Sequence, residues 1–263
     1  MHWIIGDIHG MYLPLVTLLD EIYLRDDSPR VIFCGDYVNR GPDSRRVVDL
    51  LLSLEDARFC RGNHDDAFDF LLSGTCFAPP SANPSQVTTF EHFLKYGLDQ
   101  TLHSYGVDDR RLNEARRAGT TEAMNAVLEA VPETHRQFFH TLPVVQTGHD
   151  FFVAHAKWDV DVDPGVPSFA TQLALSYKLR HDIIWGRYTQ DEVDADKGWR
   201  RQGFFGHTPV MTYPGYETAV PLRGPNVTLL DTGAAVSIEG RLTGWCVEEE
   251  RCVQAERDGD LTL

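Results

Sequence analysis

Acidic, imidazole and amide side chains follow five short apolar stretches of this 263-residue chain. The stretches read IIGDIHG at 4–10, VIFCGDYVNRG at 31–41, FCRGNHD at 59–65, FFVAH at 151–155 and FFGHT at 204–208. An apolar run that ends in a polar side chain, most often after a glycine, is typical of a buried strand whose carboxyl end carries functional residues. We therefore expect these polar side chains to meet at one place.

The residue types favour a site for two divalent metals. The candidate ligands combine carboxylates, imidazoles and one amide oxygen, a set that suits manganese, iron or zinc better than calcium: Asp7, His9, Asp36, Asn63, His155 and His207. Two such ions roughly 3.5–4 Å apart can deprotonate water near neutral pH and clamp the oxygens of an in-line displacement at phosphorus. A single Asp or His at the end of a strand more often has a structural role, so the prediction rests on the six residues taken together.

The elements that position the first three stretches alternate between strand and helix. Short buried strands are predicted at 3–5, 30–34 and 57–60, and apolar residues at helical spacing predict helices at 12–24 and 44–54. Alternation of this kind favours a parallel sheet with helices packed on it.

In the rest of the chain, the sequence pattern predicts helices up to about residue 142 and strands after it. A helix is expected at 65–72, and residues 77–142 are expected to form a mainly helical insertion with helices at 86–96, 120–131 and 132–142. A hairpin of strands at 143–146 and 151–155 and further strands, expected to be mainly antiparallel, follow at 203–206, 227–231, 235–239 and 242–247. The predicted fold is α/β, with two packed mixed sheets flanked by helices in a single domain over 1–263.

Composition excludes several classes of protein. The net charge of −15 argues against extended nucleic-acid binding, and no apolar run approaches the roughly 20 residues of a membrane helix. Five scattered cysteines without CxxC spacing argue against a disulfide framework or a structural zinc site and favour the cytoplasm. No GxxxxGK loop or GxSxG elbow is present. Nothing in the sequence indicates an oligomeric state.

The motifs GDIHG (6–10), GDYVNRG (35–41), GNHD (62–65), VAHA (153–156) and GHT (206–208) resemble those of phosphoprotein-phosphatase-type metallophosphoesterases. These include Ser/Thr protein phosphatases and symmetrical dinucleoside tetraphosphatases, and the resemblance covers about 4–233. It implies the calcineurin-like fold (α/β/β/α). It also implies a first metal on Asp7, His9 and Asp36 and a second on Asp36, Asn63, His155 and His207, with manganese expected and iron or zinc as alternatives.

The same resemblance implies roles for residues that touch the substrate. His64 would lie beside the leaving-group oxygen and protonate it while metal-bound hydroxide attacks phosphorus directly. Arg40, and Arg187 in IIWGRYT, match positions where family members place guanidinium groups on the substrate phosphate. Trp185 and Trp158 are predicted to be packing residues.

Two departures from the family pattern leave the substrate open. Asn39 stands where protein phosphatases have the Asp that pairs with the histidine of the third motif, and its carbonyl oxygen is expected to orient His64. Asp65 stands where the eukaryotic protein phosphatases have Glu, but Asp also occurs there in tetraphosphatase-like relatives.

The main prediction is a phosphomonoesterase, a bacterial-type Ser/Thr or Tyr protein phosphatase, because WGRYT and GHTPV resemble bacterial members. The expected substrate is then a phosphorylated protein or peptide, or a small phosphoester. The alternative is hydrolysis of a dinucleoside tetraphosphate or another nucleotide anhydride, and a third is a catalytically weak module that binds phosphorylated partners. We expect the segments 77–142 and 156–182 to determine the choice of substrate.

Overall fold

The computed structural model describes residues 1–80, 84–158 and 175–262. Parts of the two segments assigned to substrate choice, 81–83 and 159–174, lie outside the described residues. In the first sheet, three parallel strands continue into three antiparallel ones in the order β11-β10-β9-β1-β2-β3. Their bounds are β1 His2–Ile5, β2 Arg30–Phe33, β3 Arg58–Phe59, β9 Arg241–Cys246, β10 Arg251–Glu256 and β11 Leu261–Thr262.

The second sheet is also mixed, with the order β4-β5-β6-β8-β7. Its strands are β4 Val145–Thr147, β5 Phe151–Ala154, β6 Gln202–Phe205, β7 Leu222–Arg223 and β8 Val227–Leu229. The hairpin of β4 and β5 is confirmed, but β5 pairs with β6, and β6 with β8, in parallel. The prediction of a mainly antiparallel second half was therefore wrong for the centre of this sheet, and the parallel strands align the carboxyl ends of β5 and β6.

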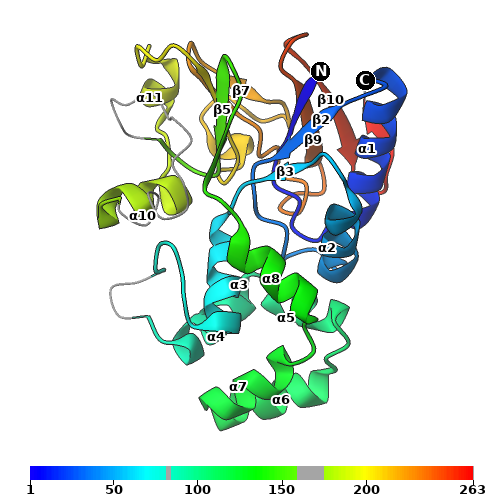
Figure 1. Cartoon of the computed structure of the whole chain (residues 1–263), viewed down its shortest axis with the longest axis vertical. Helices are drawn as coiled ribbons and strands as arrows, with labels where there is room; N and C mark the ends of the chain where they lie inside the picture. Colours follow the sequence, from blue (N-terminus) through cyan, green and yellow to red (C-terminus); the bar gives the residue numbers. More distant parts are fainter. Residues whose placement is uncertain (81–83, 159–174, 263) are drawn as a thin grey trace.

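Strand alternation places the two sheets against each other. Trp3 and Ile5 of β1 pack under the helices, whereas Ile4 points to the opposite face and joins a cluster with Val153 and Phe204 of the second sheet. Helices α1 Tyr12–Arg25 and α2 Ser44–Ser53 pack on the first sheet, and α10 Tyr177–Trp185 and α11 Gln190–Asp194 lie beside the second (Figure 1). The predicted fold, two mixed sheets flanked by helices, is confirmed.

The segment between β3 and β4 is helical and extends away from the sheets (Figure 1). Its α-helices are α3 Asn63–Ser73, α4 Gln86–Phe93, α5 Leu98–Ser104, α6 Asp109–Ala118, α7 Thr121–Leu128 and α8 Glu133–Thr141, and a single 3₁₀ turn spans Leu94–Tyr96. Asp108 and Thr120 cap α6 and α7 through side-chain oxygens. Helices α5 and α6 are absent from the sequence prediction.

One predicted strand was wrong. Residues 235–239 form turns closed by backbone bonds, because the amides of Val236 and Ser237 both donate to the carbonyl of Gly233. The strands β7, β10 and β11 were missed. In the described part of the chain, no helix is long and apolar enough to cross a membrane.

Candidate active site

The six predicted metal ligands lie together where five strands end. Asp7 and His9 follow β1, Asp36 follows β2, Asn63 opens α3 just after β3, and the last two, His155 and His207, follow β5 and β6. All but His207 are buried, with at most 5% of each residue exposed. Such a set of buried polar groups needs partners, because an unpaired one costs free energy.

Asp36 lies between two sets of donor atoms. Its Oδ2 is 3.4 Å from Nε2 of His9 and 3.5 Å from Nε2 of His155. Asn63 Oδ1 lies 3.0 Å from Nε2 of His155 and 2.8 Å from Nδ1 of His207. A carboxylate that bridges two metal ions must lie in such a central position. The donor atoms of His9, Asp36 and His64 also lie within 4.8 Å of one another, so His64 stands directly beside the candidate ligands.

Two ring orientations fit metal binding. Nδ1 of His9 lies 2.9 Å from the carbonyl oxygen of Val38, and Nδ1 of His155 lies 3.0 Å from that of Cys34. A neutral ring that donates from Nδ1 to a carbonyl leaves its Nε2 lone pair free, which is the usual arrangement of a metal-bound histidine. Both Nε2 atoms face Asp36.

The electrostatics of the cluster also fit divalent cations. Burial, with the nearby carboxylate of Asp231 adding to it, raises the pKa of Asp7 well above its usual value. Burial opposes ionisation of Asp36 as well, but His155 and His64 outweigh it and hold its pKa well below the usual value. Burial alone would lower the pKa of His155, whereas Asp36 raises it to about 10. A divalent cation would neutralise these carboxylates together.

Two further buried carboxylates support the site. Both oxygens of Asp65 accept backbone amides, from Asp36 at 2.7 Å, Tyr37 at 2.9 Å and Gly62 at 2.9 Å, so Asp65 fixes the loop that presents Asp36. Asp231 follows β8 and accepts from the amide of Gly233. Asp231 was not among the predicted residues, although LLDTG repeats the pattern of an apolar run followed by Asp that predicted the candidate ligands.

The backbone is strained at several residues of the candidate site. Of the six described non-glycine residues with positive φ, five lie at the site: His9, Asp36, Asn39, Arg40 and His207, with φ between 48° and 71°. Left-handed conformations cost free energy in residues with a Cβ and persist where the surrounding structure imposes them, often at functional sites. At Gly206, a Cβ would lie 1.9 Å from Oδ1 of Asp7, which explains the glycine before His207.

The amide of Asn39 meets the ring of His64. Asn39 Nδ2 lies 2.8 Å from His64 Nδ1, while Asn39 Oδ1 accepts from the hydroxyl of Thr101 at 3.1 Å. The expected contact is present, but the amide nitrogen faces the ring in place of the carbonyl oxygen. Thr101 belongs to α5 and was missed, because nothing in its sequence context distinguishes it from other helical threonines.

A cavity of about 180 Å³ opens over the candidate ligands Asp36, Asn63 and His207. Arg40 and Arg187, which the resemblance assigned to the substrate phosphate, both line it. Nε of Arg40 is buried and has no hydrogen-bond partner among the described residues. Two guanidinium groups beside these candidate ligands form a suitable receptor for a phosphate.

The rim of this cavity is aromatic. His92, Phe93 and Tyr96 come from α4 and the turn that follows it, and Trp185 comes from α10. Tyr96 is 45% exposed, and Trp185 is half-buried. Trp158 packs in the core as predicted, whereas Trp185 also reaches the cavity.

Two curated proteins are similar in sequence to part of this chain. The symmetrical bis(5'-nucleosyl)-tetraphosphatase of Coxiella burnetii is 44% identical over 63 residues, and that of Erwinia tasmaniensis is 41% identical over 64. Each match covers 24% of this chain and less than a quarter of the relative, 22% and 23% respectively.

Solved structures share the fold along nearly the whole chain. A protein provisionally named a diadenosine tetraphosphatase superposes with a TM-score of 0.55 at 18% identity, covering 97% of this chain and 92% of its own. A Ser/Thr protein phosphatase from Saccharomyces cerevisiae gives 0.51 at 12% identity, covering 95% of this chain and 75% of its own.

A family model decides the assignment, because it matches residues 3–211 and so most of the chain. The chain belongs to the calcineurin-like phosphoesterase family, whose members are metal-dependent hydrolases of phosphoric esters.

Proposed function

We propose that this protein hydrolyses dinucleoside polyphosphates with the help of two divalent metal ions. The observation that carries the proposal is the make-up of one cavity: candidate metal ligands at its base, Arg40 and Arg187 beside them, and an aromatic rim that includes Tyr96. A nucleotide offers phosphates to the cations and a base to the aromatic rings. The local similarity to symmetrical tetraphosphatases supports the same substrate class.

The metal site would be built from Asp7, His9, Asp36, Asn63, His155 and His207. Their mixture of carboxylate, imidazole and amide donors suits manganese, iron or zinc. When bound, the two cations supply Lewis acidity and acidify water for attack on phosphorus. Asp36 stands between the two sets of donors and would serve both ions.

The protein's own groups would bind the phosphates and move one proton. Arg40 and Arg187 hold phosphate oxygens and offset the negative charge that grows during transfer. Because Asn39 donates to Nδ1 of His64, the neutral ring carries its proton on Nε2 and can donate a hydrogen bond from there to the leaving oxygen. To give a proton up, His64 would have to be in the imidazolium form. The products are two shorter nucleotides, and no covalent intermediate on the protein is needed.

A second candidate is the phosphoprotein phosphatase favoured by the sequence analysis. The position of Arg187 on the cavity supports it, because this residue belongs to the WGRYT motif that resembles bacterial members of that branch. The candidate would use the same metals and arginines on a phosphomonoester. It leaves the aromatic rim without a specific role.

Parallel assays separate the two candidates. We expect the manganese-loaded protein to show a higher kcat/KM for diadenosine tetraphosphate than for phosphopeptides or p-nitrophenyl phosphate. Tyr96→Ala should lower kcat/KM for the dinucleotide by about 5- to 150-fold, since stacking of a base on an aromatic ring is worth about 1–3 kcal/mol. The control is Tyr23→Ala, since Tyr23 is similarly exposed (48%) but belongs to α1. A preference for phosphopeptides would reject the proposal.

A further inference from the structure

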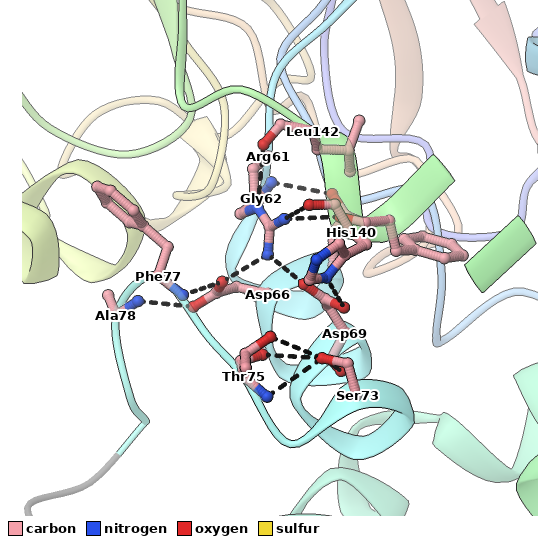
Figure 2. Close-up of polar contacts among 12 residues, drawn as sticks. Arg61, Gly62, Asp66, Asp69, Ser73, Thr75, Phe77, Ala78, His140 and Leu142 are labelled. Carbon is pink, nitrogen blue, oxygen red and sulfur yellow. Dashed lines mark hydrogen bonds and ion pairs between the residues drawn. The ribbon is translucent and has the colours of Figure 1, made fainter. Parts of the chain in front are cut away.

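Arg61 lies in the CRGNHD segment, two residues before Asn63, and only 2% of it is exposed. Its Nη1 donates to Oδ1 of Asp66 and to Oδ2 of Asp69, both at 2.9 Å (Figure 2). The rest of the guanidinium donates to three carbonyls at the end of α8: those of Leu142, Phe139 and His140. This group of side chains, the Arg61 cluster, joins α3 to α8 and lies outside the candidate active site.

Asp66 makes a second set of contacts that Asp69 does not make. Its Oδ1 accepts the amide of Phe77 at 2.7 Å, and its Oδ2 accepts the amide of Ala78 at 2.9 Å (Figure 2). All three residues are buried. Asp66 therefore fixes the backbone at 77–78 relative to the start of α3, where Asn63 and His64 lie.

The 77–78 segment in turn holds α10. Arg180 donates from Nη1 to the carbonyl of Phe77 at 3.0 Å, and Trp185 donates from Nε1 to the carbonyl of Ala78 at 3.2 Å. Trp185 lines the cavity over the candidate ligands, and Arg187 follows it by two residues. A chain of hydrogen bonds thus runs from α3 through Asp66 and the 77–78 backbone to the far wall of the cavity.

We propose that Asp66 is a positioning residue that sets the distance between the two walls of the active site. One wall is the start of α3, with Asn63 and His64, and the other is the end of α10, with Trp185 and Arg187. Both oxygens of Asp66 are needed, because each accepts one of two successive amides. Loss of either acceptor leaves a buried amide unpaired, which is costly enough to displace the segment.

Asp69 provides a matched control on the same helix. It is equally buried and pairs with the same Nη1 of Arg61, but its other oxygen faces Nδ1 of His140 at 3.3 Å. Asp66→Asn and Asp69→Asn thus remove the same kind of charge from the same cluster. Only Asp66→Asn disturbs the contact with 77–78.

The first test follows the position of Trp185 and needs no substrate. The five tryptophans are labelled with 5-fluorotryptophan, and Trp185→Phe assigns the Trp185 resonance by ¹⁹F NMR. We expect Asp66→Asn to shift this resonance and Asp69→Asn to leave it in place. An unmoved resonance in Asp66→Asn, or an equal shift in Asp69→Asn, would overturn the proposal. If Asp66→Asn does not fold, Asp66→Glu, which keeps the charge but displaces the two acceptor oxygens, replaces it and is read in the same way.

The second test measures substrate binding and rests on the proposed function for its substrate. With diadenosine tetraphosphate, we expect Asp66→Asn to raise KM about three- to tenfold with a smaller change in kcat, and Asp69→Asn to leave KM within twofold. An unchanged KM in Asp66→Asn would overturn the role in positioning the cavity wall. If the wild-type protein does not cleave this dinucleotide, the proposed function fails, and the ¹⁹F result still decides the role of Asp66.

Discussion

His64 and Asn39 meet through two nitrogens, Nδ1 and Nδ2, 2.8 Å apart. Thr101 determines which end of the amide faces the ring, because its hydroxyl occupies the carbonyl oxygen of Asn39. Nδ1 of His64 must then accept a hydrogen bond, so the neutral ring carries its proton on Nε2. This arrangement keeps a proton on Nε2, but it does not stabilise the imidazolium, which is the form of the ring that acts as a general acid.

The role of His64 as a proton donor predicts a dependence on the leaving group. We expect His64→Asn to lower turnover of an alkyl phosphate ester by about 10²–10⁴-fold, the usual contribution of general acid catalysis. The matched substrate is p-nitrophenyl phosphate, whose leaving group departs without protonation, and the loss should be much smaller there. A loss below tenfold with the alkyl ester would show that His64 is not the acid.

The same pair predicts a shift in the pH–rate profile. In Asn39→Asp, the carboxylate would accept a hydrogen bond from Nδ1–H of His64 and stabilise the imidazolium, so the pKa of the ring would rise. An acid with a higher pKa stays protonated to higher pH, and the basic limb of kcat/KM should therefore move upward. The measurement is kcat/KM against pH with an alkyl ester. An unmoved basic limb would mean that another group sets it.

At the level of single residues, the sequence predicted that the candidate ligands lie together, but it did not predict the residues that support them. Asp7, Asp36 and His155 follow apolar runs that are visible in the sequence. The positive φ of Asn39 and the contact with Thr101 depend on a helix 62 residues further along the chain, and no local pattern records such a contact. Sequence spacing predicted which residue types meet but not the backbone strain that orients them.

At the level of elements, α8 connects the inserted helices to the rest of the molecule. His135 on α8 is buried, with Nδ1 2.9 Å from the hydroxyl of Tyr105 on the loop after α5 and Nε2 3.0 Å from Oδ1 of Asp49 on α2. Burial lowers the pKa of His135, although Asp49 works in the opposite direction. The neutral ring fits these contacts, since it accepts from Tyr105 and donates to Asp49.

This histidine predicts a loss of stability in weak acid. The unfolded chain takes up a proton at His135 near its ordinary pKa of about 6.5, whereas the folded protein resists until lower pH. Because the unfolded state then binds more protons, the free energy of unfolding should fall as the pH drops below about 6.5, by at most about 1.4 kcal/mol per pH unit for this one group.

Urea unfolding of the metal-loaded protein at pH 7.5 and 5.5 tests this. His135→Gln keeps a donor for Asp49 and cannot take up the proton, so the variant should lose less stability between the two pH values than the wild type. Equal losses in the two proteins would mean that His135 does not contribute to the pH dependence.

Elements with clear periodicity were predicted well, and those formed by tertiary contacts were not. Helices α1 and α2 carry apolar residues at helical spacing and were predicted within a residue of their ends. Strand β10 begins with Arg251 and ends with Glu256, and it forms because β9 supplies a pairing edge along its whole length. The apolar residues of 235–239 suggested a strand, but Ile238 is 88% exposed and no sheet edge is paired there.

At the level of the whole molecule, part of the acidic charge is buried at the candidate active site. The chain carries a net charge of −15, and four of its carboxylates, those of Asp7, Asp36, Asp65 and Asp231, are buried at the site. Burial and neighbouring acids raise the pKa of Asp231 to about 6 and that of Asp65 to about 7. Such a cluster opposes folding without cations and attracts them, so metal binding and stability should be coupled.

This coupling predicts that one substitution has opposite effects with and without metal. Manganese at 100 times its Kd should stabilise the wild-type protein by about 2.7 kcal/mol. Asp7→Asn removes a buried negative charge beside Asp231, so in chelator it should melt at the same temperature as the wild type or higher. In manganese it should melt at a lower temperature, because it has lost a ligand.

Thermal unfolding with chelator and with manganese, followed by circular dichroism, gives all four melting temperatures. The control is Asp20→Asn, a change of the same charge at an exposed position on α1, which should leave the manganese effect unchanged. If Asp7→Asn were less stable than the wild type in chelator and gained as much from manganese, Asp7 would serve the fold and not the metal. The order of the two melting temperatures reverses between chelator and manganese only if the carboxylate of Asp7 destabilises the metal-free protein and stabilises the metal-bound one.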